Sequence, residues 1–172
     1  MKTLAFFLAV ALIPMVALAA DSKSIYVVDM QRVIDESIMG KAARNNMQEE
    51  IKTEELKLST RKSELQRSQA ALDKQSSVLS SSALQEKREG LSKQERELMR
   101  DVQDKREELS RKNGVEISRI VKEIDAIVEQ LAKNKQYEFV IEKDRELVLF
   151  VKPDYDLTEQ VIEALNKKKM DF

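Results

Sequence analysis

A seven-residue repeat of leucines is the feature that most constrains the fold of this chain. From Ile51 the repeat continues at Leu58, Leu65, Leu72 and Leu79, and it returns at Leu84, Leu91 and Leu98. Such a repeat is typical of α-helices that pack along a seam. The second seam position is polar in the first half of the tract, where it holds Glu54, Arg61, Ser68 and Gln75. The tract from Gly40 to about Lys133 is therefore predicted to form long helices with a seam that is only half apolar.

A serine cluster interrupts the repeat at residues 76–82 and predicts a reversal of the chain. Ser82, with Gln85 three residues later, has the pattern of a capping box that restarts a helix. We therefore expect two antiparallel helices with their tip near residues 76–82. At 1.5 Å per residue, the first arm is about 60 Å long.

The end of the second helix is more apolar than the tip. Both of its seam positions are filled by Ile117, Ile120, Ile124, Ile127 and Leu131. An apolar stripe this broad must pack against more than one helix. We therefore expect a tightly packed base and flexible arms. The seam also slips by one residue beside Asn113 and Gly114. Glycine inside a helix costs about 1 kcal/mol relative to alanine, so a bend or bulge is predicted at Gly114, with Gly90 as a second candidate hinge.

Short strand patterns flank the helical tract. Residues Ile25 to Val28 predict a strand buried on both faces, and Asp29 is placed to cap a short helix. Gly40 is expected to separate that helix from an arm beginning at Lys41.

After the arm, residues 137–142 and 146–151 predict a β-hairpin that turns at residues 143–145. Asp156, with Glu159 three residues later, is predicted to cap a final helix. A strand at each end of the helical tract predicts one small sheet that ties the two ends together. So small a base buries little on its own, and two or three copies are expected to share it.

The first 19 residues have the pattern of an export signal. Lys2 precedes an apolar core from Leu4 to Ile13, and Ala17-Leu18-Ala19 is a typical cleavage site. The apolar core is shorter than a membrane-spanning helix requires. We expect an exported product, in the periplasm if the host has two membranes. The sequence contains no cysteine, so its stability must come from packing or oligomerisation.

The charges are unevenly placed. Residues 60–100 carry nine Lys or Arg against six Asp or Glu, a net charge of +3, whereas the two ends of the chain are acidic. The whole chain has a net charge of -1, which gives no electrostatic support for binding nucleic acid. The basic tip is either ordinary solvated helix surface or a surface that attracts anionic lipid or acidic polymer.

Catalysis has no support in the sequence. There is no histidine and no cysteine, which removes the usual general base, the thiol nucleophile and most transition-metal sites. No phosphate-binding glycine motif occurs. We expect a protein that is not an enzyme, with no catalytic residue, metal or cofactor.

The order of parts resembles the Skp/OmpH family of periplasmic chaperones. The resemblance is carried by Ile25-Tyr26-Val27-Val28-Asp29-Met30-Gln31-Arg32-Val33, Gly40-Lys41-Ala42-Ala43, Phe139-Val140-Ile141 and Asp156-Leu157-Thr158. It implies a homotrimer with a small β body and helical arms around a cavity that holds unfolded outer-membrane proteins. On this basis we expect a mainly α fold with a signal peptide (1–19), a body (20–39 and 114–172) and a helical hairpin arm (40–113).

Two functions from different classes remain open. One is an ATP-independent holdase that keeps unfolded outer-membrane β-barrel proteins from aggregating, and the other is a structural coiled-coil spacer or adaptor of the cell envelope. The half-apolar seam and the glycines favour the holdase, because a spacer benefits from stiffness.

Four groups of residues are candidates for these roles. The candidates for client binding are Leu58, Leu65, Leu72, Leu91 and Leu98, although they are at least as well explained as a zipper between the two helices. The candidates for electrostatic capture or contact with anionic lipid or lipopolysaccharide are Lys74, Lys87, Arg88, Lys93 and Arg96. The candidates for oligomerisation and body packing are Ile25, Val27, Ile117, Ile120, Ile124, Ile127, Leu131, Phe139, Ile141 and Leu149. The candidate hinges are Gly90 and Gly114.

Overall fold

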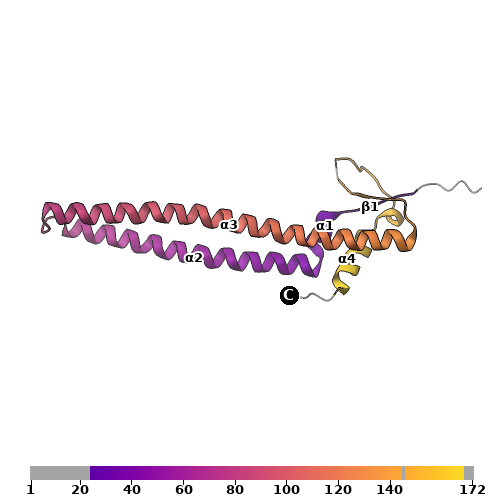
Figure 1. Cartoon of the computed structure of the whole chain (residues 1–172), viewed down its shortest axis with the longest axis horizontal. Helices are drawn as coiled ribbons and strands as arrows, with labels where there is room; N and C mark the ends of the chain where they lie inside the picture. Colours follow the sequence, from indigo (N-terminus) through magenta and orange to yellow (C-terminus); the bar gives the residue numbers. More distant parts are fainter. Residues whose placement is uncertain (1–23, 145, 169–172) are drawn as a thin grey trace, which may run out of the picture.

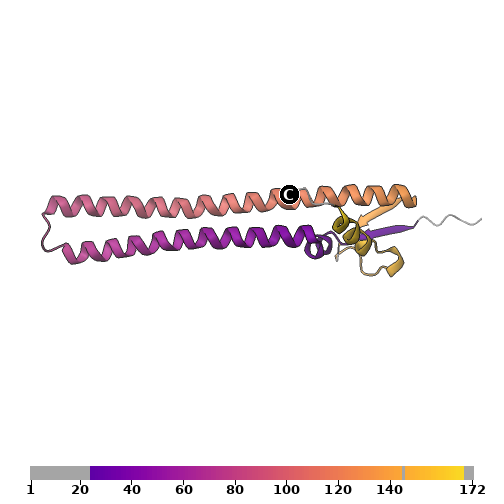
Figure 2. The same ribbon diagram turned by 90° about the horizontal axis from the view of Figure 1, so that it is seen from below.

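The computed structural model describes residues 24–144 and 146–168, and the predicted export signal lies outside this part of the chain. The described elements, in order, are β1 (Ile25–Val28), α1 (Met30–Glu36), α2 (Ile38–Gln75), α3 (Ser81–Lys135), β2 (Phe139–Glu142), the 3-10 turn η1 (Pro153–Tyr155) and α4 (Thr158–Lys167). Figures 1 and 2 show α2 and α3 side by side, with the smaller elements gathered at one end. The predicted mainly helical fold with a long antiparallel hairpin is confirmed.

The tip of the hairpin is a short serine-rich turn. Helix α2 ends at Gln75, and the Oγ of Ser76 donates a hydrogen bond to the carbonyl oxygen of Asp73. Helix α3 is capped by Ser80, whose Oγ accepts a hydrogen bond from the amide of Ala83. The predicted cap at Ser82 is therefore wrong by two residues. The side chain of Gln85 bonds to Glu89 instead of reaching back to a cap.

The corner between α1 and α2 is tight and buried. Asp29 caps α1 as predicted, accepting a hydrogen bond from the amide of Arg32 at 2.8 Å. Ser37 ends α1 and also caps α2, since its buried Oγ accepts from the amide of Gly40. The prediction that the arm begins at Lys41 is wrong, because α2 begins at Ile38 and contains Gly40. A Cβ on Gly40 would lie 1.6 Å from the carbonyl oxygen of Ile34, so only glycine allows this approach.

The two ends of the chain are joined by a parallel strand pair. Strand β1 pairs with β2 in the register Ile25↔Phe139 to Val28↔Glu142, and the helical hairpin is the connection between them. The predicted tie between the ends is confirmed. Strand β1 is not buried along its whole length, because Ile25 is exposed while Val27 and Val28 are buried.

The predicted β-hairpin is wrong. The described residues between β2 and Pro153 form no strand, and Leu147, Leu149 and Phe150 are exposed. The amides of Leu147 and Val148 both donate to the carbonyl oxygen of Asp144, which turns the chain away from β2. On its other side, β1 is bridged at Val27 by Asp156. The apolar run 147–151 therefore has no described strand partner.

The core lies where the end of α3 meets α1, α4 and β1. We call these elements, together with β2, the body. The buried isoleucine stripe of α3 packs against one face of α4, and the cluster contains Val28, Val33, Met39, Ile120, Ile124, Ile127, Leu157, Val161, Ile162 and Leu165. Asn166 of α4 also accepts a hydrogen bond from the amide of Ile38 at 2.8 Å. Helix α4 therefore braces the start of α2 against the isoleucine stripe.

Asp156 joins the residue that follows β2 to the start of α4. Its carboxylate accepts a hydrogen bond from the Nζ of Lys143 at 2.6 Å and from the amide of Thr158 at 3.1 Å. The predicted capping box is wrong by one residue, because the N-cap of α4 is Leu157, which makes no side-chain cap bond, and Glu159 pairs with Arg32 of α1. Burial acts to raise the pKa of Asp156, but the hydrogen bonds from Lys143 and Thr158 together hold that pKa below its ordinary value.

Asp156→Asn is expected to lower the free energy of unfolding by about 1–2 kcal/mol at pH 7, because it removes a charged partner of Lys143. A carboxylate with a lowered folded-state pKa contributes stability above its unfolded pKa of about 3.9, and the contribution is lost as the pH falls through the folded value. The gap between the two proteins should therefore close below about pH 4. Urea denaturation across a pH series measures this. Asp154→Asn is the control, since Asp154 is exposed and has no described partner. An equal loss in both variants would contradict the role of Asp156.

Candidate functional site

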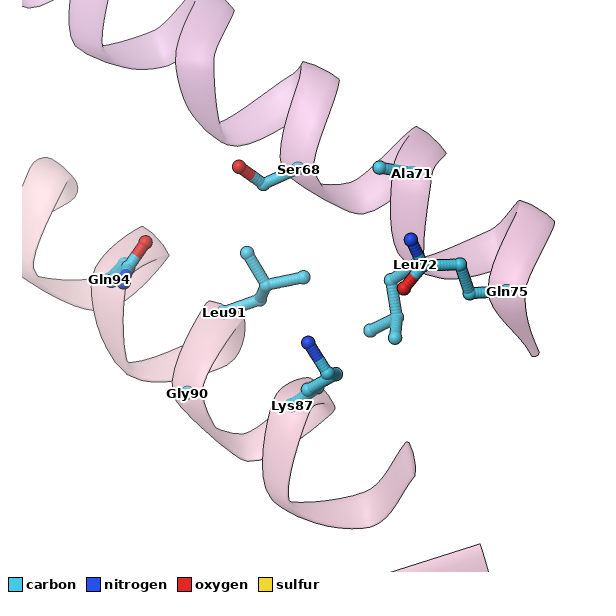
Figure 3. A pocket seen from close by; sticks show the side chains of 8 residues that line it. All are labelled: Ser68, Ala71, Leu72, Gln75, Lys87, Gly90, Leu91 and Gln94. Carbon is cyan, nitrogen blue, oxygen red and sulfur yellow. The ribbon is translucent and has the colours of Figure 1, made fainter. Parts of the chain in front are cut away.

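The heptad leucines point into the seam between α2 and α3. Leu65 and Leu72 are buried, and Leu58, Leu91 and Leu98 are half-buried. Figure 3 shows Leu72 and Leu91 directed into the space between the two helices near the tip. This burial favours the zipper explanation for Leu65 and Leu72, while the half-buried leucines keep part of their surface accessible.

Polar pairs replace the missing half of the seam. Arg61 of α2 bonds to Asp101 and lies 3.8 Å from Glu97, both on α3. Lys112 of α3 bonds to Glu50 of α2. Hydrogen bonds from Lys105 and then Lys112 lower the pKa of Glu108, so this carboxyl group stays charged at neutral pH. Exposed ion pairs are each worth only about 0–1 kcal/mol. The arm, meaning α2 with the facing part of α3, is therefore held together weakly along most of its length.

The five tip cations are exposed, and they form no ion pair within the described part of the chain. No described carboxylate lies within salt-bridge distance of Lys74, Lys87, Arg88, Lys93 or Arg96. Arg96 donates a hydrogen bond to the Oγ of Ser92 at 2.6 Å. Val78, in the turn between the helices, is 80% exposed. The tip thus presents positive charge beside an apolar side chain.

Both candidate hinge glycines lie inside uninterrupted helix. Helix α3 runs through Gly90 and Gly114 without a break, so the predicted bulge at Gly114 is wrong. Helix α2 still faces α3 on both sides of Gly114, and the buried residues of α3 that join the core with α1 and α4 begin at Ile120. Nothing lies within 4 Å of a Cβ built on either glycine. Whether α3 bends at these positions stays a prediction.

The residues proposed for body packing divide into two groups. Val27, Ile120, Ile124 and Ile127 are buried in the core, and Ile117 and Leu131 are half-buried. The other four, Ile25, Phe139, Ile141 and Leu149, are exposed. They lie on β1, on β2 and in the segment after β2, where Leu147 and Phe150 are also exposed. Several large apolar side chains of the strands and of the segment after β2 are therefore exposed within a single chain.

Sequence reasoning missed the exposed apolar residues of the arm. Leu56, Val78, Met99 and Val115 are each more than half exposed, and none falls on the heptad positions. Plotting apolar residues that lie off the heptad stripe would have identified them.

The described residues bear on two kinds of chemistry, the holding of a metal ion and acid catalysis. They contain no group of three or more His, Cys, Asp or Glu side chains placed to hold a metal ion. The three tyrosines form one packing cluster, in which the rings of Tyr26 and Tyr137 stack with centroids 3.8 Å apart. Burial and then the two neighbouring tyrosines raise the pKa of Tyr26, which makes it a poor acid at neutral pH.

The sequence matches the profile of a known protein family, and the structure resembles a solved crystal structure. The sequence profile of the family described as "Outer membrane protein (OmpH-like)" matches residues 24–165. A crystal structure from Caulobacter crescentus, of a candidate outer membrane chaperone (OmpH-like), superposes with a TM-score of 0.78 at 21% identity, covering 83% of each chain. No curated protein matches this sequence significantly.

Proposed function

The chain belongs to the OmpH-like outer membrane protein family, and we propose that it is an ATP-independent holdase chaperone for unfolded outer-membrane β-barrel proteins. Clients would be held in a cavity between helical arms and kept from aggregating on the way to the outer membrane. This function requires no catalytic residue and no cofactor. The crystallised relative is named as an outer membrane chaperone, which supports the proposal.

The observation that carries the proposal is the contrast between the body and the arm. The body has fully buried residues such as Ile120, Ile124 and Leu157, whereas most of the arm seam is only half-buried and closed by exposed ion pairs. A weakly zipped helix pair can change its packing at little cost and keeps apolar side chains accessible. Those are the properties required for holding many unfolded chains through weak contacts.

We propose that two or three copies share the body, with a trimer expected from the family resemblance. The exposure of Ile25, Phe139, Ile141, Leu147, Leu149 and Phe150 supports this, because large apolar side chains gathered at a protein surface often mark protein contacts. The run 147–151 has the composition of a strand, and a neighbouring copy would supply the strand edge that it lacks.

The proposed location is the periplasm. It is supported by the export pattern of residues 1–19, which lie outside the described part of the chain. In the described part, no helix combines the length and apolar character that crossing a bilayer requires.

The spacer or adaptor of the envelope is the alternative, and one assay separates the two. A urea-denatured β-barrel protein is diluted into buffer without ATP, with and without the chain, and light scattering is followed. A holdase suppresses the scattering at near-stoichiometric ratios. Unchanged scattering at every ratio and salt concentration would refute the holdase and leave the spacer.

The tip cations are proposed to speed capture and to contact anionic lipid or lipopolysaccharide. Salt screens charges over about 8 Å at physiological strength. Changing Lys74, Lys87, Arg88, Lys93 and Arg96 to glutamine should therefore lower the association rate for client strongly at low salt, with a modest effect on affinity. Stopped-flow binding and vesicle flotation with anionic lipid, each across a salt series, measure these effects.

The control is a variant with glutamine at five exposed cations away from the tip, namely Lys41, Lys52, Arg111, Lys122 and Lys152. Equal rate losses in the two variants would show that only total charge matters and would contradict a specific role for the tip.

A further inference from the structure

One side of the arm carries a continuous apolar groove. Two hollows between α2 and α3, of about 820 and 580 Å³, share Val102 and Arg106 and so join end to end. We call the joined hollows the arm groove. Its apolar lining comes from both helices: Met47, Ile51, Leu58 and Leu65 of α2, and Leu98, Met99, Val102 and Leu109 of α3.

The opposite side of the arm is polar. Its hollow near the tip, of about 350 Å³, is lined largely by polar side chains that include Ser68, Gln75, Lys87 and Gln94, as Figure 3 shows. Arg61 lies seven residues before Ser68 and Asp101 seven after Gln94, so their ion pair closes this same side. In its outer half, the arm therefore presents an apolar hollow on one side and a largely polar hollow on the other.

The dimensions of the arm groove match one extended peptide segment. On α2 it runs from Met47 to Asp73, about 39 Å at 1.5 Å per residue. An extended chain covers that length in about 11–12 residues. A strand of an outer-membrane barrel has about 9–11 residues.

The spacing of the apolar lining also fits a strand. The ion pairs Arg61–Asp101 and Glu50–Lys112 align the two helices. In that alignment, no gap between successive apolar side chains exceeds about 7.5 Å over the roughly 27 Å from Met47 to Leu65. Side chains on one face of a strand recur about every 6.8 Å. Between Met47 and Leu65 the groove thus offers an apolar contact for about every second residue of an extended segment, and nearer the tip Ala70 continues the apolar lining.

The charges around the groove argue for an uncharged occupant. Its edges carry Lys62, Lys105 and Arg106 as cations and Glu54, Glu55, Asp73 and Glu95 as anions, so the two signs nearly balance. A strongly charged partner would meet like charges along the groove.

We propose that the arm groove binds one extended segment of alternating apolar and polar residues with little net charge, its apolar face against α2 and α3. This is the pattern of a β-barrel strand before it folds. Met99, which is 72% exposed, supplies a flexible contact that adapts to different side chains. The identity of the bound segment rests on the proposed holdase function. The difference between the two sides of the arm is observed in the structure and does not depend on that function.

The test uses the full chain and a labelled peptide. The probe is an 11-residue fluorescein-labelled peptide of alternating valine and serine, and the control peptide has the same composition with its valines in one block. Fluorescence anisotropy should show tighter binding of the alternating peptide. Met99→Gln should weaken that binding about three- to ten-fold.

Matched variants distinguish a groove contact from a general loss of apolar surface. Leu56, which is 70% exposed and lies outside the arm groove, is the counterpart of Met99, and Leu56→Gln should leave binding unchanged. Ala70 lines the groove and Ala71 the opposite hollow, so Ala70→Gln should weaken binding while Ala71→Gln should not.

The proposed peptide binding in the arm groove would be contradicted if the two variants of each matched pair weakened binding equally, or if the chain bound the two peptides equally well. Light scattering with a denatured β-barrel protein, on the same variants, separates this failure from failure of the holdase. A wild type that suppresses aggregation while the pairs behave alike would leave the holdase without this groove. If only the variants on the groove side weaken peptide binding but the wild type does not suppress aggregation, the groove proposal stands and the holdase proposal is contradicted.

Discussion

Replacing Gly40 by alanine is expected to lower the free energy of unfolding by several kcal/mol, on the order of 3–5. The new Cβ would lie 1.6 Å from the carbonyl oxygen of Ile34, which belongs to the backbone and cannot rotate away. The α1–α2 corner would have to open, and the bond between the amide of Gly40 and the Oγ of Ser37 would be lost. Urea denaturation followed by circular dichroism measures the change.

Gly114→Ala is the matched control with the opposite sign. Gly114 is exposed inside α3, and nothing lies within 4 Å of the position that a Cβ would take there. Alanine at this position should raise the free energy of unfolding by about 0.4–1 kcal/mol, because it restricts the unfolded chain and favours helix. Similar stabilities for the Gly40→Ala and Gly114→Ala proteins would contradict the tight corner.

Ile124→Asp is expected to unfold the body and to dissociate any oligomer that the body forms. Ile124 is fully buried among the residues of α1, α3 and α4, and no described cation is part of that cluster. Placing a carboxyl group there costs on the order of 4–5 kcal/mol through lost packing and the burial of a polar group. Circular dichroism and sedimentation velocity together measure the effect.

Val115→Asp is the control for Ile124→Asp. Val115 lies on the same helix but is 66% exposed, so the substitution should change the free energy of unfolding by less than about 0.5 kcal/mol. If the Ile124→Asp protein stayed folded and fully associated, the isoleucine stripe would not be what stabilises the body.

The helical hairpin was predictable because a seven-residue repeat has few other solutions. Leu65 and Leu72 fall on the repeat, and both are buried. The isoleucine stripe was predictable for the same reason. The caps were harder, because residues 76–82 offer several serines and the choice of Ser80 depends on how the two helices meet.

The second strand of the β-hairpin could not be predicted because a strand is defined by its partner. The run 147–151 is apolar and strand-like, but β1 is already paired with β2 on one side and bridged by Asp156 on the other. The amino-acid composition of a segment indicates its propensity to form a β-strand, but it does not show whether a neighbouring strand has an edge free to pair with it. The shift of the apolar stripe near Gly114 was misread as a bulge, whereas the helix continues through it without a break.

The candidate site was only partly predictable. The cations of the tip were identified by counting charges along the sequence, and in the structure their side chains are exposed. The two-sidedness of the arm does not follow from a heptad pattern, because it depends on which residues beside the seam face the same groove. Met99 and Ala70 become candidates only when α2 and α3 are placed together.

Removing the outer arm is the most direct test of the division between a self-sufficient body and a client-holding arm. Residues 59–100 are replaced by a short turn, which is geometrically reasonable because Arg61 and Asp101 lie side by side. The shortened protein should keep the oligomeric state of the full chain in sedimentation velocity and lose suppression of β-barrel aggregation. A shortened protein that suppresses aggregation as well as the full chain does, or that falls apart into monomers, would contradict this account.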